Sequence, residues 1–250
     1  MVFVLMKGMK AILMCLPFLS LVSIMTGHAG EPDEFCVVQD RDGYTNVRVK
    51  PSLTSKVIAR VDHGEIVWIY SSAVKKWPNV IFMDKAGKEQ AGFIHASRVK
   101  PLTDFESLSG KVFEDEQKEV FEKGNLKVEI QIQPFQLEGL ELTYKEFTEG
   151  GRYLMKIDGK PYWGTDGGMP REQYQKISIR KGDQTVALPD EALANLFNPG
   201  LYPGNTKVIF NPDDNAIYLT SFNSDGAGGY VVAFVIQDGK YKSRAVLSPF

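Results

Sequence analysis

Cysteine and histidine are scarce in this sequence. Its 250 residues include two cysteines, Cys15 and Cys36, and three histidines, and neither residue type occurs after His95. A cysteine peptidase needs a thiol beside a histidine base, and a zinc amidase needs histidine and carboxylate ligands around one metal. The long C-terminal part lacks the residues for either arrangement. We therefore expect no catalytic cysteine, no metal site and no cofactor.

An excess of charge of one sign is also missing. The chain has 29 Lys and Arg residues against 31 Asp and Glu, a net charge of −2. Nucleic-acid-binding domains usually carry a strongly basic face, so we expect no nucleic-acid partner. No Gly-x-Ser-x-Gly motif marks a serine hydrolase. A glycosidase-type carboxylate pair stays open as an alternative, but with 31 acidic residues a chance pair is the simpler interpretation. The sequence thus predicts that the protein is not an enzyme.

Long apolar runs are limited to residues 11–25, which follow Lys7 and Lys10. The small residues Gly27 and Ala29 come next, at the spacing that signal peptidase recognises. A run of about 15 apolar residues is short for a membrane span, which needs about 20. We expect residues 1–29 to be a cleaved signal peptide. The mature protein would then be periplasmic or secreted, without a stable membrane anchor.

Residues 35–101 contain short strand-like segments separated by turns. Asp-Gly at 42–43, His-Gly at 63–64 and Lys-Ala-Gly-Lys at 85–88 divide five or six such segments, as in a small barrel. The opening DGYTNVRVKPS (42–52) and SKVI (55–58), the spaced Gly64, Trp77 and Val80, and the ending GFIHASRV (92–99) resemble the bacterial SH3 (SH3b) family. This resemblance implies an SH3-like barrel that accompanies cell-wall enzymes and recognises cell-wall peptides or proteins.

The aromatic residues of this barrel have two interpretations. Core packing is the first, and Trp68 and Tyr70 share one face of a strand whose direction the sequence leaves open. The second is an aromatic-lined groove for a short peptide, since peptide sites combine apolar walls with a few polar groups. The candidate groove residues are Tyr44, Asn46, Arg48, Trp77, Phe93 and His95.

Residues 102–124 look different from the segments on either side. Val112, Phe113, Val120 and Phe121 lie among acidic residues at amphipathic spacing, which suggests a linker with a short helix. Strict alternation returns with Leu126, and Asp-Gly pairs at 158–159 and 238–239 predict hairpins. The turns at 181–183 and 212–215 predict two more, between 176–180 and 185–188 and between 208–211 and 216–221. A short helix is expected within 189–197. The predicted fold is all-β: an SH3-like barrel (35–101), a linker (102–124) and an antiparallel sandwich-like domain (125–250).

The C-terminal half resembles a group of small secreted proteobacterial domains with no assigned function. It shows GTDG (164–167), Leu-Pro (188–189), Asn-Pro (198–199), SDGAGGY (224–230) and a late arginine. The candidate residues are Asp166, Asp225, Tyr230 and Arg244. The glycines of 226–229 are best explained by a sharp turn with positive φ. A calcium loop formed by Asn223, Asp225, Asp213 and Asp214 is the alternative.

These features predict a periplasmic or secreted, non-catalytic binding protein. Its expected partner is a cell-wall peptide or a periplasmic protein, recognised through the SH3b-like barrel. The alternative is a periplasmic inhibitor or immunity protein that masks a toxic or lytic enzyme, because a small secreted chain without catalytic residues fits both roles.

Overall fold

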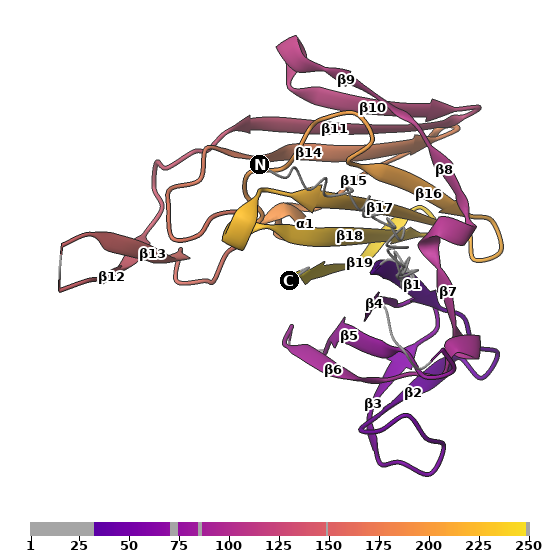
Figure 1. Ribbon diagram of the computed structural model, residues 1–250. Helices are drawn as coiled ribbons and strands as arrows, with labels where there is room; N and C mark the ends of the chain where they lie inside the picture. The colour runs from indigo at the N-terminus through magenta and orange to yellow at the C-terminus, as the bar shows by residue number, and fades with distance from the viewer. Residues whose placement is uncertain (1–32, 71–74, 85–86, 149, 249–250) are drawn as a thin grey trace, which may run out of the picture.

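The computed structural model describes residues 33–70, 75–84, 87–148 and 150–248. The expected signal peptide lies outside these residues. Within them the chain is all-β, as predicted, and no helix there is long and apolar enough to cross a membrane. Three layers follow one another in Figure 1: an outer sheet, a middle sheet and a barrel sheet.

The barrel sheet curls into a half-barrel and has the strand order β3-β2-β6-β5-β4-β1-β7. Its strands are β1 (Glu34–Val38), β2 (Tyr44–Arg48), β3 (Val57–Asp62), β4 (Ile66–Tyr70), β5 (Asn79–Met83), β6 (Glu89–Phe93) and β7 (Val99–Pro101). Two short 3-10 helices, η1 (Ala96–Arg98) and η2 (Leu102–Asp104), flank β7.

The middle sheet has the order β19-β18-β17-β16-β8, and the outer sheet has the order β15-β14-β11-β10-β9. The strands of the middle sheet are β8 (Glu106–Leu108), β16 (Lys207–Asn211), β17 (Ala216–Asn223), β18 (Tyr230–Gln237) and β19 (Lys240–Leu247). Those of the outer sheet are β9 (Gly110–Phe113), β10 (Lys118–Lys123), β11 (Leu126–Pro134), β14 (Glu172–Lys181) and β15 (Gln184–Ala187). The remaining short helices are η3 (Glu114–Glu116), α1 (Asp190–Leu193) and η4 (Gly226–Gly228).

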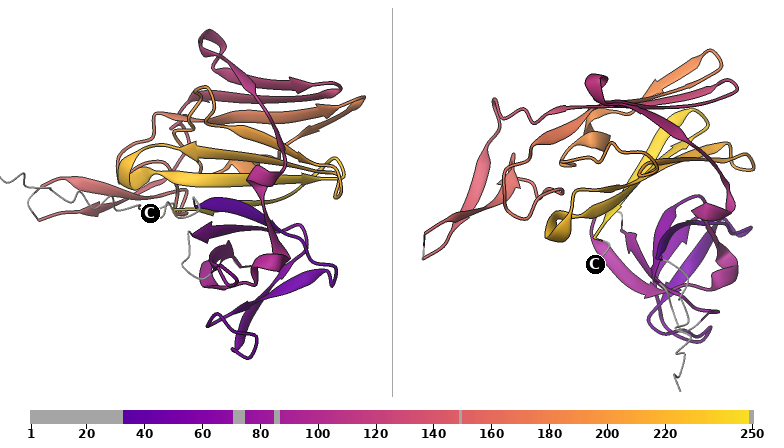
Figure 2. Two further views of the ribbon diagram at one scale, coloured as in Figure 1. Left: turned by 45° about the vertical axis from the view of Figure 1, so that its right-hand side comes forward. Right: turned by 45° about the horizontal axis from the view of Figure 1, so that its top comes forward.

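A two-stranded ribbon, β12 (Leu142–Glu146) with β13 (Arg152–Ile157), stands out from the body in all views (Figures 1 and 2). Its base is anchored by Leu154 and Ile157, which pack with Phe197.

The middle sheet is covered on both faces. On β18, Val232 and Phe234 face the outer sheet and belong to the sandwich core. The residues between them, Val231, Ala233 and Val235, face the barrel and form a second core with it. A strand buried on both sides reads as a continuous apolar run, which is what Tyr230–Ile236 is. The barrel and the middle sheet therefore share one hydrophobic core.

The barrel wall that meets the middle sheet is built from β1 and β4. On β1, Phe35 and Val37 point to the shared core, while Cys36 and Val38 point into the barrel. Trp68 on β4 stands against Phe35, with ring centroids 4.8 Å apart and an interplanar angle of 80°. Trp68 therefore points to the middle sheet and packs in the shared core.

The linker expected at residues 102–124 is wrong, because this segment contributes strands to two sheets. Its strand β8 pairs with β16, and its strands β9 and β10 pair with each other and with β11. The period-2 pattern of β10 is real, with Glu119 and Phe121 pointing inward. Because one of these inward positions is a glutamate, Glu119, the sequence of β10 resembles an acidic, amphipathic helix.

Three hairpins are confirmed, and one is wrong. The predicted partners β14 and β15, β16 and β17, and β18 and β19 are each paired. The hairpin across Asp158-Gly159 is limited to a single bridge between Ile157 and Lys160, and β13 pairs with β12 instead. Pro161 follows that bridge and has no N–H to continue a ladder. The expected helix is one turn, α1, and Asn195 beyond it is left-handed with φ 63°.

Candidate functional site: a groove on the barrel

Strand β2 places three of the predicted groove residues on one face. Thr45 and Val47 are buried, so Tyr44, Asn46 and Arg48 alternate to the outside. This follows from the period-2 geometry of a strand whose other face fills the barrel.

These side chains line a groove of about 350 Å³ together with Trp77 and His95. Five of the six residues predicted from sequence are thereby brought together. Phe93 is the exception: it lies half-buried on β6, opposite Arg48 and Asn79, and is not part of the lining. The other lining residues, which the sequence pattern missed, are Asp40, Asp42, Thr45, Leu53, Ser97 and Arg98.

Two rings form the apolar wall of the groove. Trp77 and His95 make an edge-to-face contact with centroids 5.0 Å apart. The Ser97 backbone N–H donates to His95 Nδ1 at 3.3 Å, which caps η1. Because Nδ1 accepts this bond, the ring can carry its proton on Nε2 and offer a donor to a ligand.

The Ser97 hydroxyl lies 2.8 Å from the same nitrogen, a distance also found in the Ser–His pair of a serine hydrolase. A catalytic base, however, is held in place by a third group. Among the described residues, no hydrogen bond joins His95 Nε2 to a carboxylate. The contact is a helix-capping arrangement within one turn.

The groove combines charges of both signs. Arg98 donates to Asp40 at 2.7 Å and lies 3.7 Å from Asp42, whose side chain is 74% exposed. Arg48 donates a hydrogen bond to the Ser55 carbonyl at 2.7 Å and so holds the loop between β2 and β3 in place. This loop carries Leu53, which is 72% exposed at the margin of the groove. The groove thus presents aromatic rings, the Asp42 carboxylate, the guanidinium groups of Arg48 and Arg98, and the exposed apolar side chain of Leu53 at its margin.

Comparison with family models, with curated proteins and with solved structures gives no match for this chain.

The four residues predicted in the C-terminal domain do not form one site. The phenol of Tyr230 is fully buried and donates to the Phe197 carbonyl at 3.1 Å. Arg244 donates to the carbonyls of Ala192 and Ala194 and so anchors the segment of α1. These two side chains stabilise the sandwich.

Asp166 and Asp225 lie on two loops that do pack together. Asp166 accepts a hydrogen bond from Tyr153 at 2.7 Å, and Asp225 is exposed before η4. The Ser224 hydroxyl of one loop donates a hydrogen bond to the Gly164 carbonyl of the other at 2.7 Å. A Cβ on Gly228 would lie 2.8 Å from the Thr165 backbone. The motifs GTDG (164–167) and SDGAGGY (224–230) therefore form two loops that pack against each other. Gly226 is required for its positive φ, whereas Gly228 has a negative φ and is required for the close approach to Thr165.

The calcium alternative is not supported by the geometry. Asp213 and Asp214 precede β17 and Asp225 follows it, so an eight-residue strand of roughly 25 Å separates them. The side chain of Asn223 is buried and accepts from Gly200 N–H. Within the described residues, no group of three or more His, Cys, Asp or Glu side chains could hold a metal ion.

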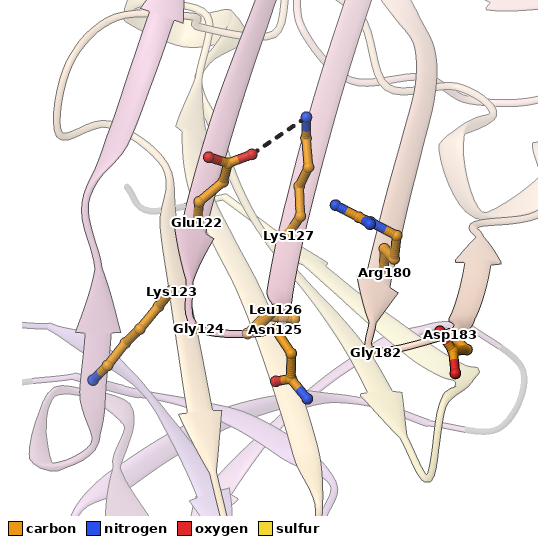
Figure 3. A pocket seen from close by; sticks show the side chains of 9 residues that line it. All are labelled: Glu122, Lys123, Gly124, Asn125, Leu126, Lys127, Arg180, Gly182 and Asp183. Atoms are coloured by element: carbon orange, nitrogen blue, oxygen red, sulfur yellow. Dashed lines mark ion pairs between the residues drawn. The ribbon is translucent and has the colours of Figure 1, made fainter.

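A second polar cavity of about 500 Å³ lies at the turns of the outer sheet (Figure 3). Lys127 is there 3.3 Å from Glu122 and 3.7 Å from Glu129. These contacts neutralise Lys127, and Arg180 and Asp183 bring one charge of each sign to the same lining.

Proposed function

We propose that this chain is a non-catalytic binding protein that recognises a short peptide in the barrel groove. The observation that carries the proposal is the convergence of Tyr44, Asn46, Arg48, Trp77 and His95 on one groove. Cell-wall stem peptides suit this lining, because their ammonium and carboxylate groups complement Asp42 and the two arginines. Residues 1–29 would direct the chain to the periplasm or out of the cell, where such peptides occur.

Loss of a groove ring should weaken this binding. Titration with a synthetic stem peptide of alanine, γ-linked glutamate and diaminopimelate, followed by calorimetry, should give a Kd that rises about tenfold in Tyr44→Ala. Tyr202→Ala is the matched control, because Tyr202 is 53% exposed and does not line the groove. Equal affinities of the wild type and Tyr44→Ala, or no binding of the stem peptide, would refute the proposal.

The ribbon β12–β13 favours a second candidate, an inhibitor or immunity protein. It carries Phe147 near its tip (49% exposed) and Met155 along one strand (45% exposed). Projecting apolar residues of this kind mark interaction sites, and a narrow ribbon can enter the cleft of a partner enzyme.

Under this second candidate, a lytic periplasmic enzyme should lose activity on addition of the protein and regain it with Phe147→Ser. Glu146→Ser, at the exposed last residue of β12, is the control and should inhibit like the wild type. Inhibition that survives Phe147→Ser would exclude the ribbon as the inhibitory element.

A further inference from the structure

The two arginines of the barrel groove differ in what they bind. Arg98 donates to Asp40 at 2.7 Å and lies 3.7 Å from Asp42, so these three side chains form one ion cluster. Arg48 takes part in no ion pair within the described residues. Its bond to the Ser55 carbonyl uses one of the five N–H groups of the guanidinium. The groove therefore contains one guanidinium group with donors to spare and no carboxylate beside it.

Two further donors stand next to Arg48. Asn46 precedes Arg48 by two residues on the same face of β2, a spacing of about 7 Å. Arg48 pairs with Phe93 on β6, and His95 follows Phe93 by two residues. His95 Nδ1 accepts from the Ser97 N–H, which leaves Nε2–H as its donor. In the part of the chain that the structure describes, neither this Nε2 nor the Asn46 amide has a hydrogen-bond partner.

An anion is the ligand group that suits these three donors. The oxygens of a carboxylate accept hydrogen bonds and donate none, and hydrogen bonds to an ionised group are about twice as strong as those between neutral groups. The planar guanidinium of an arginine can hold both carboxylate oxygens at once. Asn46, Arg48 and His95 together match a carboxylate.

The loop between β2 and β3 bounds the groove beside Arg48 (Figure 1). Leu53 of this loop is part of the groove lining. The loop is held in shape at Ser55, whose carbonyl accepts from Arg48 and whose hydroxyl accepts from the Lys50 N–H at 2.9 Å. An extended chain that runs along β2 toward Arg48 meets this loop and has to end there. The position beside Arg48 therefore suits the end of a peptide.

The two ends of the groove also differ in charge. Residues 48–56 include Arg48, Lys50 and Lys56 and no acidic residue. Asp42 lies before the other end of β2, and its side chain is 74% exposed. A peptide that places its C-terminal carboxylate at Arg48 and an ammonium group toward Asp42 complements both ends.

We propose that Arg48, Asn46 and His95 bind the chain-terminal carboxylate of the peptide, so that the groove recognises a free C-terminal end and no internal segment. This inference rests on the function proposed above and adds to it the direction of the bound peptide and the group that is recognised.

The test compares three forms of the stem peptide on the wild type by calorimetry. The first is the free acid, the second has its chain-terminal carboxylate amidated, and the third has the α-carboxylate of its glutamate amidated. The chain-terminal amide should raise the Kd about tenfold, since hydrogen bonds to a charged group are lost. The glutamate amide removes the same charge elsewhere in the peptide and should raise the Kd less than about twofold.

A variant of the groove assigns the effect to Arg48. Arg48→Gln should bind the free acid about tenfold more weakly than the wild type and should bind the chain-terminal amide as well as the free acid. Arg41→Gln is the matched control, because Arg41 is exposed before β2 and does not line the groove. It removes the same charge from the protein and should keep the wild-type difference between the two peptides.

The outcomes separate this inference from the function on which it rests. If the wild type bound all three forms equally well, the peptide would not be recognised by its end, and the proposed function would stand without this inference. Equal weakening by the two amides, or an Arg48→Gln variant that still distinguished free acid from chain-terminal amide, would also overturn it. If the wild type bound none of the forms, the proposed function and this inference would fail together. The comparison on the wild type decides the question even if Arg48→Gln fails to fold.

Discussion

Trp68→Ala is expected to lower the free energy of unfolding by about 3–5 kcal/mol, the usual cost of deleting a buried tryptophan. Trp68 is 8% exposed and lies in the core that the barrel shares with the middle sheet. The cavity would open against Phe35 on one side and the face of the middle sheet on the other. Urea denaturation followed by circular dichroism measures the loss. Trp68→Phe, which keeps an aromatic ring, is the control and should lose less.

The same variant tests whether the two parts of the chain are one cooperative unit. Tyr218, Ala233 and Val235 face the barrel and would be exposed without it. Hydrogen exchange should therefore show that amides of β17 and β18 lose protection together with those of β1 and β4. If the barrel strands alone lost protection while β17 and β18 kept wild-type values, the shared core would contribute little stability.

The sequence predicted the hairpins whose turns dictate their geometry. Asp238 and Gly239 both have positive φ, 51° and 70°, which is the conformation that an Asp-Gly pair adopts in a two-residue hairpin turn. Asp158 and Gly159 have the same conformation, yet no strand follows them. A turn motif reverses the direction of the chain, but strand pairing continues only if the residues after the turn can form it. Pro161, which lacks an N–H, prevents this after Asp158-Gly159.

The arrangement in three layers was missed although its signal is present. The run Tyr230–Ile236 contains no charged residue, so neither face of that strand can be exposed to water. A sandwich with one exposed face on each sheet does not accommodate such a strand. The polar alternation of Leu126–Gln133 indicates instead a sheet covered on one side, as found for β11.

The groove was predicted in part because strand alternation is local. One buried position, Val47, is enough to turn Asn46 and Arg48 outward on the same strand. Asp40, Leu53 and Arg98 reach the groove from loops and a 3-10 turn, whose course depends on contacts such as that between Arg98 and Asp40 across 58 positions of sequence. No spacing rule reveals a contact of this kind.

Glu119 is expected to make stability fall as the pH rises from about 4.5 to 7. Its side chain is fully buried, and neither carboxyl oxygen has a hydrogen-bond partner among the described residues. Burial raises the pKa of Glu119 from 4.5 to about 7, and the nearby Thr206 hydroxyl offsets part of the shift. The folded state then holds a proton that the unfolded chain has released.

Stability therefore decreases with pH across this window, because the folded state binds more protons there than the unfolded state. The contribution is fully present below about pH 4.5 and is lost above about pH 7. Its upper limit is about 3 kcal/mol, from the difference between the two pKa values. Other groups titrate as well, so the effect is isolated by comparison with a variant that has no proton to lose at this position.

Glu119→Gln keeps the shape of the side chain and removes its titration. Urea denaturation between pH 4.5 and 8 should show the free energy of unfolding of the variant rising relative to that of the wild type, by up to about 3 kcal/mol, as the pH rises. Glu129→Gln is the matched control, because Glu129 lies on β11 beside Val120 and faces away from the core. That control should follow the wild type across the range. If Glu119→Gln also ran parallel to the wild type at every pH, the buried carboxyl would already be ionised or hydrated in the native state.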